Sequence, residues 1–134
     1  MTTEPTLPQP TTVPSQRSLV VKTTSGLERP EATNQAFTVA AAALASGVDV
    51  SLWLTGESAW FAVPGRAEEF RLPHAAPLED LLGAVLAAGR VTVCTQCAAR
   101  RDLTQDDLLD GVRIAGAPSF VEETIQDGAQ ALVY

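Results

Sequence analysis

Residues 91–101 read VTVCTQCAARR, a short apolar run that leads directly into a Cys-x-x-Cys pair and two arginines. Both cysteines of the chain, Cys94 and Cys97, lie in this segment. An apolar run of this length is typical of a buried strand, and reactive groups in parallel sheets gather just beyond the carboxyl ends of strands. The segment therefore predicts a strand over residues 91–94 and a candidate site where that strand ends.

The segments on either side alternate between strand and helix patterns. Helices are predicted from Pro30 to a glycine cap at Gly47 and from Pro77 to Gly89, because each starts with proline and acidic residues and ends at glycine. Shorter helices are expected from Thr104 to Gly111, with Asp107 completing an N-cap pair, and after Ser119, where Glu122 completes a capping box. Further strands are predicted at residues 19–21, 48–54, 112–114 and 131–133.

Two stretches between these elements have weaker patterns. The strand at residues 48–54 is expected to have one strongly apolar face, because Val48, Val50, Leu52 and Leu54 alternate with the other residues. Residues 58–61 are interpreted as a single helical turn before the break at residues 64–65. The aromatic residues in this part of the chain are expected in the core or at a subunit interface; they are Trp53, Trp60 and Phe61.

Short turns joining alternating strands and helices predict an α/β fold, with a mostly parallel five-stranded sheet covered by helices on both faces. The length of 134 residues suits one domain, and we place it at residues 18–134. Residues 1–17 are rich in proline and threonine and contain almost nothing to bury, so a disordered tail is expected there.

Charge and composition exclude several classes of partner. The formal net charge of −7 argues against a surface for nucleic acid or anionic membranes, since both need a basic patch. No apolar run approaches the ~20 residues that span a bilayer, and the first residues lack the pattern of a secretory signal. Two closely spaced cysteines in such a chain indicate reduced thiols in the cytoplasm.

The thiol pair has a functional interpretation and a structural one. If a helical turn begins near Gln96, its free N–H groups point at Cys94, and Arg100 and Arg101 add positive charge nearby. Both effects favour the thiolate, which is the nucleophilic form. An accessible thiolate can attack a sulfane sulfur and hold it as a persulfide. Alternatively, the cysteines are small buried hydrophobic residues, or they form a thioredoxin-like dithiol switch.

Metal and cofactor sites have little support in the sequence. A zinc site would need two more ligands, and the only histidine, His74, lies in a proline-rich loop that we expect to be exposed. The turn at residues 23–26 follows the first strand as a flavodoxin phosphate loop would, but Glu28 would repel a phosphate. We therefore expect an ordinary polar turn, no metal and no cofactor.

The ordered set of motifs resembles the DsrE/DsrF/TusD family of small sulfur-relay proteins. The likeness runs from about Leu19 to the end of the chain. It is carried by CTQC at residues 94–97, by ARR at 99–101, by Leu103, by Leu109-x-Gly111-Val112 and by the terminal strand at 131–133. The helix after the first strand, the GVDV step at 47–50 and the helix at 77–86 also fit the pattern.

The resemblance implies a three-layer α/β/α sandwich that assembles as a homotrimer or homohexamer. It also implies a possible sulfurtransferase, in which Cys94 carries sulfur as a persulfide between a donor and an acceptor protein, with Cys97 as an auxiliary thiol and Arg100 and Arg101 as electrostatic support. Asp102 departs from the pattern, because the family usually has glycine there. The alternatives are a Cys-x-x-Cys redox protein and a non-catalytic oligomeric binding module.

Overall fold

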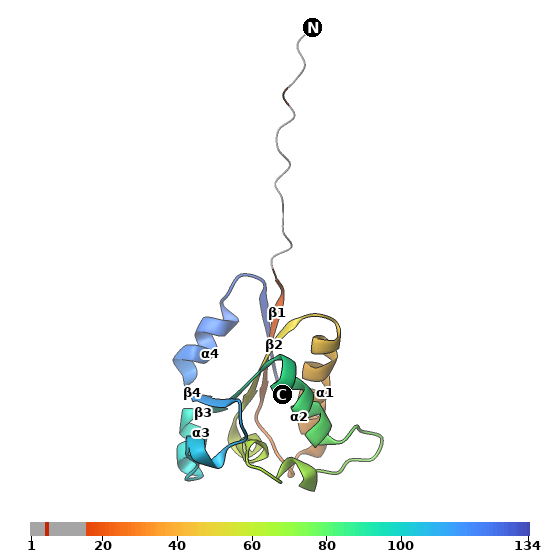
Figure 1. Cartoon of the computed structure of the whole chain (residues 1–134), viewed down its shortest axis with the longest axis vertical. Coiled ribbons are helices and arrows are strands. Elements are labelled where there is room, and N and C mark those ends of the chain that lie inside the picture. The colour runs from red at the N-terminus through yellow and green to blue at the C-terminus, as the bar shows by residue number, and fades with distance from the viewer. Residues whose placement is uncertain (1–4, 6–15) are drawn as a thin grey trace.

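The computed structural model describes residue 5 and residues 16–134, and its centre is a five-stranded parallel sheet with strand order β4-β3-β2-β1-β5. Helices cover both faces, so the fold is the predicted three-layer α/β/α sandwich, with every strand pair parallel (Figure 1). The strands are β1 (Ser18–Thr23), β2 (Asp49–Leu54), β3 (Arg90–Cys94), β4 (Val112–Ala115) and β5 (Ala129–Val133). The α-helices are α1 (Pro30–Ala45), α2 (Leu78–Ala88), α3 (Thr95–Arg100) and α4 (Ala117–Thr124), and the 3-10 helices are η1 (Gly56–Ala62), η2 (Ala67–Glu69) and η3 (Gln105–Asp107).

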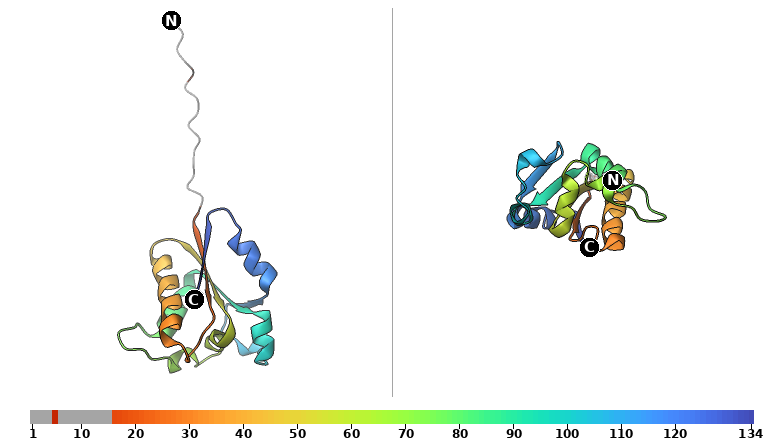
Figure 2. Two further views of the ribbon diagram at one scale, coloured as in Figure 1. Left: turned by 180° about the vertical axis from the view of Figure 1, so that it is seen from behind. Right: turned by 90° about the horizontal axis from the view of Figure 1, so that it is seen from below.

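The larger core lies between the sheet and the pair α1 and α2, which share one face in both side views (Figures 1 and 2). Phe61 of η1 contacts two other aromatic residues of this core. The centroid of the Phe61 ring lies 5.8 Å from that of Phe37 and 6.1 Å from that of Phe70, both edge to face. Leu52, Leu54, Val91 and Val93 supply the strand side of this core. Burial of these aliphatic side chains supplies most of the driving force for folding.

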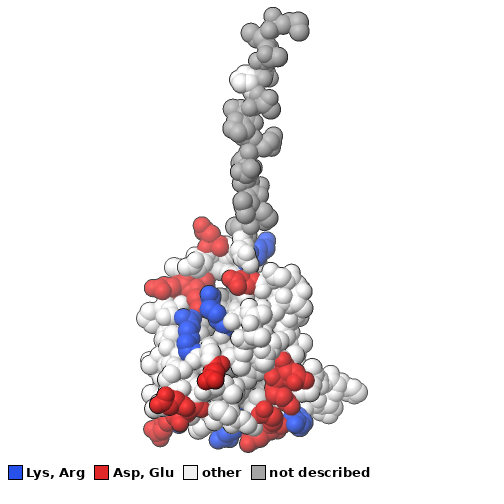
Figure 3. Space-filling view, viewed as in Figure 1, with Lys and Arg blue, Asp and Glu red and all other residues white. Residues whose placement is uncertain are grey.

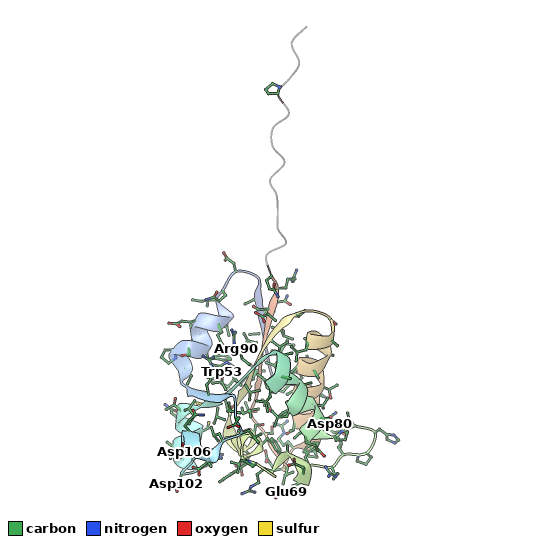
Figure 4. All side chains as sticks on the ribbon, viewed as in Figure 1. Trp53, Glu69, Asp80, Arg90, Asp102 and Asp106 are labelled. Atoms are coloured by element: carbon green, nitrogen blue, oxygen red, sulfur yellow. The ribbon has the colours of Figure 1, made fainter. Side chains whose placement is uncertain are left out.

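The opposite face of the sheet is covered by α3 and α4, and α4 has no fully buried residue. A carboxylate attaches α4 to the sheet: Glu123 Oε2 accepts hydrogen bonds from Ser51 Oγ at 2.8 Å and from Trp53 Nε1 at 2.6 Å. The other oxygen of Glu123 pairs with Arg113 and, at 3.7 Å, with Arg90. Figure 4 shows Trp53 and Arg90 between α4 and the strands. A partly buried polar network thus holds this helix, which has no fully buried residue of its own.

The strongly apolar face predicted for β2 is present, since Val50, Leu52 and Leu54 are buried. Ser51 and Trp53 on its other face are buried too, because helices cover both sides of a parallel sheet. The capping box expected at Ser119 and Glu122 is wrong. Helix α4 begins earlier, at Ala117, because Pro118 fits the first turn and the Ser119 amide donates to the Gly116 carbonyl.

Two shorter helical predictions hold only in part. Thr104 and Asp107 do form a capping box, but it starts the single 3-10 turn of η3 rather than a helix to Gly111. The chain then turns away because the Leu109 amide donates to the Ala62 carbonyl at 2.8 Å. The helical turn expected at residues 58–61 is part of η1, which is longer.

Positions 1–4 and 6–15 of the tail expected at residues 1–17 lie outside the described residues, so the domain boundary at residue 18 stays a prediction. Within the described part of the chain, no helix is long and apolar enough to cross a membrane. Acidic side chains predominate at the lower edge of the face in Figure 3, where the strands end. Glu69, Asp102 and Asp106 lie at this edge (Figure 4).

Candidate functional site

Cys94 is the last residue of β3 and the N-cap of α3, with an extended backbone at φ −62° and ψ 132°. Helix α3 starts at Thr95, one residue before the predicted position, so the free N–H groups of its first turn lie at the end of the helix that Cys94 caps. The side chain is partly exposed, as a reactive thiol requires. The predicted placement of Cys94 at a strand-to-helix junction is confirmed.

The surroundings of Cys94 lower the pKa of its thiol below the ordinary value. Partial burial raises the pKa, but hydrogen bonds from the backbone N–H groups of Cys97 and Gln96 lower it, as do a hydrogen bond with the Cys97 side chain and the charge of Lys22. The lowering effects together exceed the effect of burial. The site therefore increases the thiolate fraction at neutral pH.

Cys97 lies one helical turn further along α3, and its side chain is only 8 % exposed. Its Sγ accepts a hydrogen bond from the backbone N–H of Gly56 across 3.2 Å. Both cysteines are free thiols. Gly56 has no local pattern that would mark it as a neighbour of the thiols, since η1 precedes α3 by about forty residues.

Lys22, the single lysine of the chain, is a charged residue that acts on Cys94, and no pattern in the sequence marks it. The strand register places Lys22 beside Trp53 and Trp53 beside Thr92. Cys94 follows Thr92 by two residues and so faces the same side of the sheet. Only the register of three strands brings this lysine to the thiol side, so no motif could have revealed it.

The two arginines after the Cys-x-x-Cys pair contact other groups. Arg100 is exposed, and its Nη2 donates to Gln96 Oε1 at 3.3 Å. Arg101 pairs with Glu57 of η1, with Nη2 to Oε2 at 3.0 Å, and donates to the Cys97 carbonyl at 3.1 Å. Their direct electrostatic support of the thiolate stays a prediction.

Asp102, which departs from the family pattern, adopts a left-handed backbone with φ +54° directly after α3. Glycine reaches this region without strain, whereas a side chain makes it costly. The conformation explains why glycine suits this position. Aspartate is among the few other residues that tolerate it.

The structure offers little to a metal or a phosphate. His74 lies in an exposed loop, and residues 5 and 16–134 contain no group of three His, Cys, Asp or Glu side chains that could hold a metal ion. The hydroxyls of the turn after β1 have partners within the protein: Thr23 bonds to Ser58 at 2.8 Å, and Thr24 donates to the Tyr134 carbonyl at 2.7 Å. A cavity of about 330 Å³, lined by Arg90 and Arg113 among others, lies at the amino ends of the strands, at the opposite edge from Cys94.

Comparison with known proteins identifies the relatives of this chain. It is 29 % identical over 104 residues to the uncharacterized protein MJ0760 of Methanocaldococcus jannaschii, and the match covers 77 % of this chain and 38 % of that protein. The chain therefore spans well under half the length of this relative.

Two solved structures share the fold. The ychN protein from E. coli superposes with a TM-score of 0.72 at 18 % identity, over 88 % of this chain and 99 % of that one. The protein of unknown function MTH1491 from Methanobacterium thermoautotrophicum gives a TM-score of 0.60 at 11 % identity, over 88 % of this chain and 98 % of that one. The model of the DsrE/DsrF-like family matches residues 17–134. This match confirms the resemblance seen in the sequence: the chain belongs to the DsrE/DsrF-like family.

Proposed function

We propose that this chain is a sulfur carrier in which Cys94 accepts a sulfane sulfur, holds it as a persulfide and passes it to the thiol of a partner. The observation that carries the proposal is the partly exposed Cys94 thiol at the carboxyl end of β3, whose pKa is lowered by the first turn of α3, by the Cys97 side chain and by Lys22 despite partial burial. Membership of the DsrE/DsrF-like family supports it by analogy.

The transfer needs no external oxidant. The Cys94 thiolate attacks the outer sulfur of a donor persulfide, a new S–S bond forms, and the donor leaves as a thiolate when its own S–S bond breaks. Delivery repeats this exchange, with the acceptor thiolate as the nucleophile and Cys94 as the leaving group. The N–H groups that stabilise the Cys94 thiolate would also favour its departure, because a thiol of lower pKa leaves faster.

We also propose that the protein works as a homo-oligomer, with a trimer or hexamer as the expected state. Most of the large exposed apolar side chains in the described part of the chain lie on α4, on its C-cap or on the edge strand β5; they are Val121, Ile125, Leu132 and Val133. Exposed apolar side chains gathered on two elements that contact each other are typical of an interface. Light scattering on the intact chain tests this, and a monomeric mass would contradict it.

The sulfur donor and acceptor would be other proteins with reactive thiols, in a compartment such as the cytoplasm that keeps thiols reduced. A second candidate function is thiol–disulfide exchange. It is favoured by the placement of two free thiols, Cys94 at the N-cap of α3 and Cys97 three residues further along the helix. In that reaction the Cys94 thiolate attacks a partner disulfide, and Cys97 then displaces the partner, which leaves with both electrons as a dithiol.

The test is sulfur transfer by purified protein. The chain is incubated with a sulfane donor, freed of the donor by gel filtration and treated with cyanide, which removes a persulfide sulfur as thiocyanate. The expected result is about one thiocyanate per wild-type chain and none for Cys94→Ser. If wild type instead forms a reversible Cys94–Cys97 disulfide with an oxidised dithiol and retains no sulfur, the redox function is favoured. If neither reaction occurs, the non-catalytic binding module stands.

A further inference from the structure

Glu57 connects η1 with the end of α3, the helix that carries Cys97. Its Oε2 accepts hydrogen bonds from Arg101 at the end of α3, at 3.1 Å from Nε and 3.0 Å from Nη2. The same oxygen accepts a hydrogen bond from Trp60 Nε1 at 3.0 Å. The Arg101 side chain is only 18 % exposed, so this ion pair is partly shielded from solvent.

The residue before Glu57 contacts Cys97 directly. The Gly56 N–H donates to Cys97 Sγ at 3.2 Å, and Arg101 Nη1 donates to the Cys97 carbonyl at 3.1 Å. Arg101 thus contacts both Cys97 and Glu57, the residue that follows Gly56. Only glycine fits at position 56, because its φ is +54° and a Cβ there would lie 2.5 Å from the Thr24 carbonyl oxygen. The amide is held between the end of β1 and α3.

The Gly56 hydrogen bond also determines what the Cys97 thiol can do. A thiol has one proton to donate, and its sulfur accepts weakly. Because the sulfur of Cys97 accepts from Gly56, its S–H is free to donate to another acceptor. Cys94 is the N-cap of α3 and Cys97 is its third residue, and side chains three residues apart lie on the same face of a helix. The sulfur of Cys94 is therefore within reach of this S–H, and the lowered pKa of Cys94 agrees with such a contact.

We propose that Glu57 is a positioning residue for the thiol pair: its ion pair with Arg101 holds η1 against α3, so that the Gly56 amide fixes the Cys97 thiol as a hydrogen-bond donor to the Cys94 thiolate. This inference rests on the proposed function of Cys94 and deepens it. It gives Arg101 a role through Glu57 rather than directly on the sulfur. It gives Cys97 the role of a reduced donor during sulfur transfer.

The sign of one pKa change separates this role from simple electrostatics. Glu57→Gln removes a negative charge from η1 and leaves the positive charge of Arg101 unpaired, and by Coulomb's law both changes would lower the pKa of the Cys94 thiol. Loss of positioning would instead weaken the hydrogen bond from Cys97 and raise that pKa. The matched control is Glu69→Gln, because Glu69 is about as exposed as Glu57 (53 % against 51 %) and its ion pair, with Arg66 at 3.8 Å, includes no residue of α3.

The experiment measures iodoacetamide labelling of Cys94 in the full chain across pH, with the site resolved by mass spectrometry. We expect Glu57→Gln to move the profile to higher pH and to lower the rate at pH 7 by about twofold or more, with Glu69→Gln unchanged. An unchanged profile, or a move to lower pH, in a Glu57→Gln protein whose circular dichroism matches wild type would overturn the proposal.

If Glu57→Gln fails to fold, two variants of Cys97 test the contact between Cys97 and Cys94. Cys97→Ser keeps a hydroxyl that can donate, so its Cys94 profile should stay near wild type, whereas Cys97→Ala should shift it to higher pH. Equal profiles for these two variants would contradict the donor role of Cys97. Persulfide formation is measured on the same samples, so a wild type that takes up no sulfur rejects the carrier function, while the labelling profiles still decide the role of Glu57.

Discussion

The ammonium group of Lys22 lies 5.2 Å from the centroid of the Phe120 ring, so a side chain from β1 reaches across to α4 on the thiol side of the sheet. The strand register places this lysine, the only one of the chain, on the face where Cys94 lies. A charge that lowers the pKa of the Cys94 thiol thus comes from the strand β1, two positions away from β3 in the sheet.

Removal of the Lys22 charge should make Cys94 less acidic. Lys22→Met keeps an apolar stem over Phe120 and removes the charge, and we expect the pKa of Cys94 to rise. Labelling of Cys94 across pH measures the change. Arg100→Gln is the control, because Arg100 is exposed and contacts Gln96. An equal or larger shift for Arg100→Gln would mean that the arginine, not Lys22, supports the thiolate.

The wild-type thiol should label with a midpoint at lower pH in the folded chain than in the chain unfolded in urea. The same shift links stability to pH. Because the pKa of Cys94 is lower in the folded state, the unfolded chain binds the proton more tightly, and the free energy of unfolding rises with pH between the folded and unfolded pKa values. This contribution is complete above the unfolded value and is lost as the pH falls through the folded one. Urea unfolding of wild type and Cys94→Ser should therefore diverge in this window, and parallel pH curves would count against a depressed pKa.

Helix α4 should depend on one carboxylate. Glu123→Ala leaves Trp53 Nε1 and Ser51 Oγ without their acceptor beneath the helix, so we expect a loss of about 1–3 kcal/mol in the free energy of unfolding. Glu122→Ala, the exposed neighbour, should change it by less than about 0.5 kcal/mol. Urea denaturation measures both. Equal losses would show that the helix is held by something other than the Glu123 network.

Asp102→Gly should stabilise the fold. The left-handed backbone at φ +54° costs an L-residue more than it costs glycine, although glycine also gains freedom in the unfolded chain. We expect a net gain of about 0.5 kcal/mol in the free energy of unfolding. Asp102→Val should lose stability, because a β-branched residue is strained at positive φ. The urea midpoints of the two variants give the answer, and a Val variant as stable as the Gly variant would refute the backbone argument.

Local sequence patterns predict most of the fold because local chemistry determines most of it. Each of the five strands is predicted at its observed place, and the starts of α1 and α2 follow from proline and acidic residues. Local patterns fail to predict a helix start where contacts between distant segments determine it. Ser119 and Glu122 fit a capping box, yet α4 starts at Ala117. Helix α4 is anchored through Glu123, one residue further along.

Of the candidate site, the sequence predicts the nucleophile but not the groups that support it. The position of Cys94 at the end of β3 follows from the strand pattern and the sequence that continues into α3. Its supporting groups do not, because Lys22 and Gly56 reach the thiols through the sheet register and through η1. Arg101 is adjacent in sequence but contacts Glu57, a residue that no local pattern connects with the thiols. Side-chain partners in the folded chain, rather than proximity in sequence, decide which charges act on the sulfur.

The mass of the intact protein after exposure to a sulfane donor tests the central claim most directly. The account predicts that wild type and Cys97→Ser each gain one sulfur atom near pH 7, that the gain maps to the peptide containing Cys94, and that Cys94→Ser gains none. A Cys94→Ser protein that gains sulfur like wild type, or a wild type that gains none, would contradict the account.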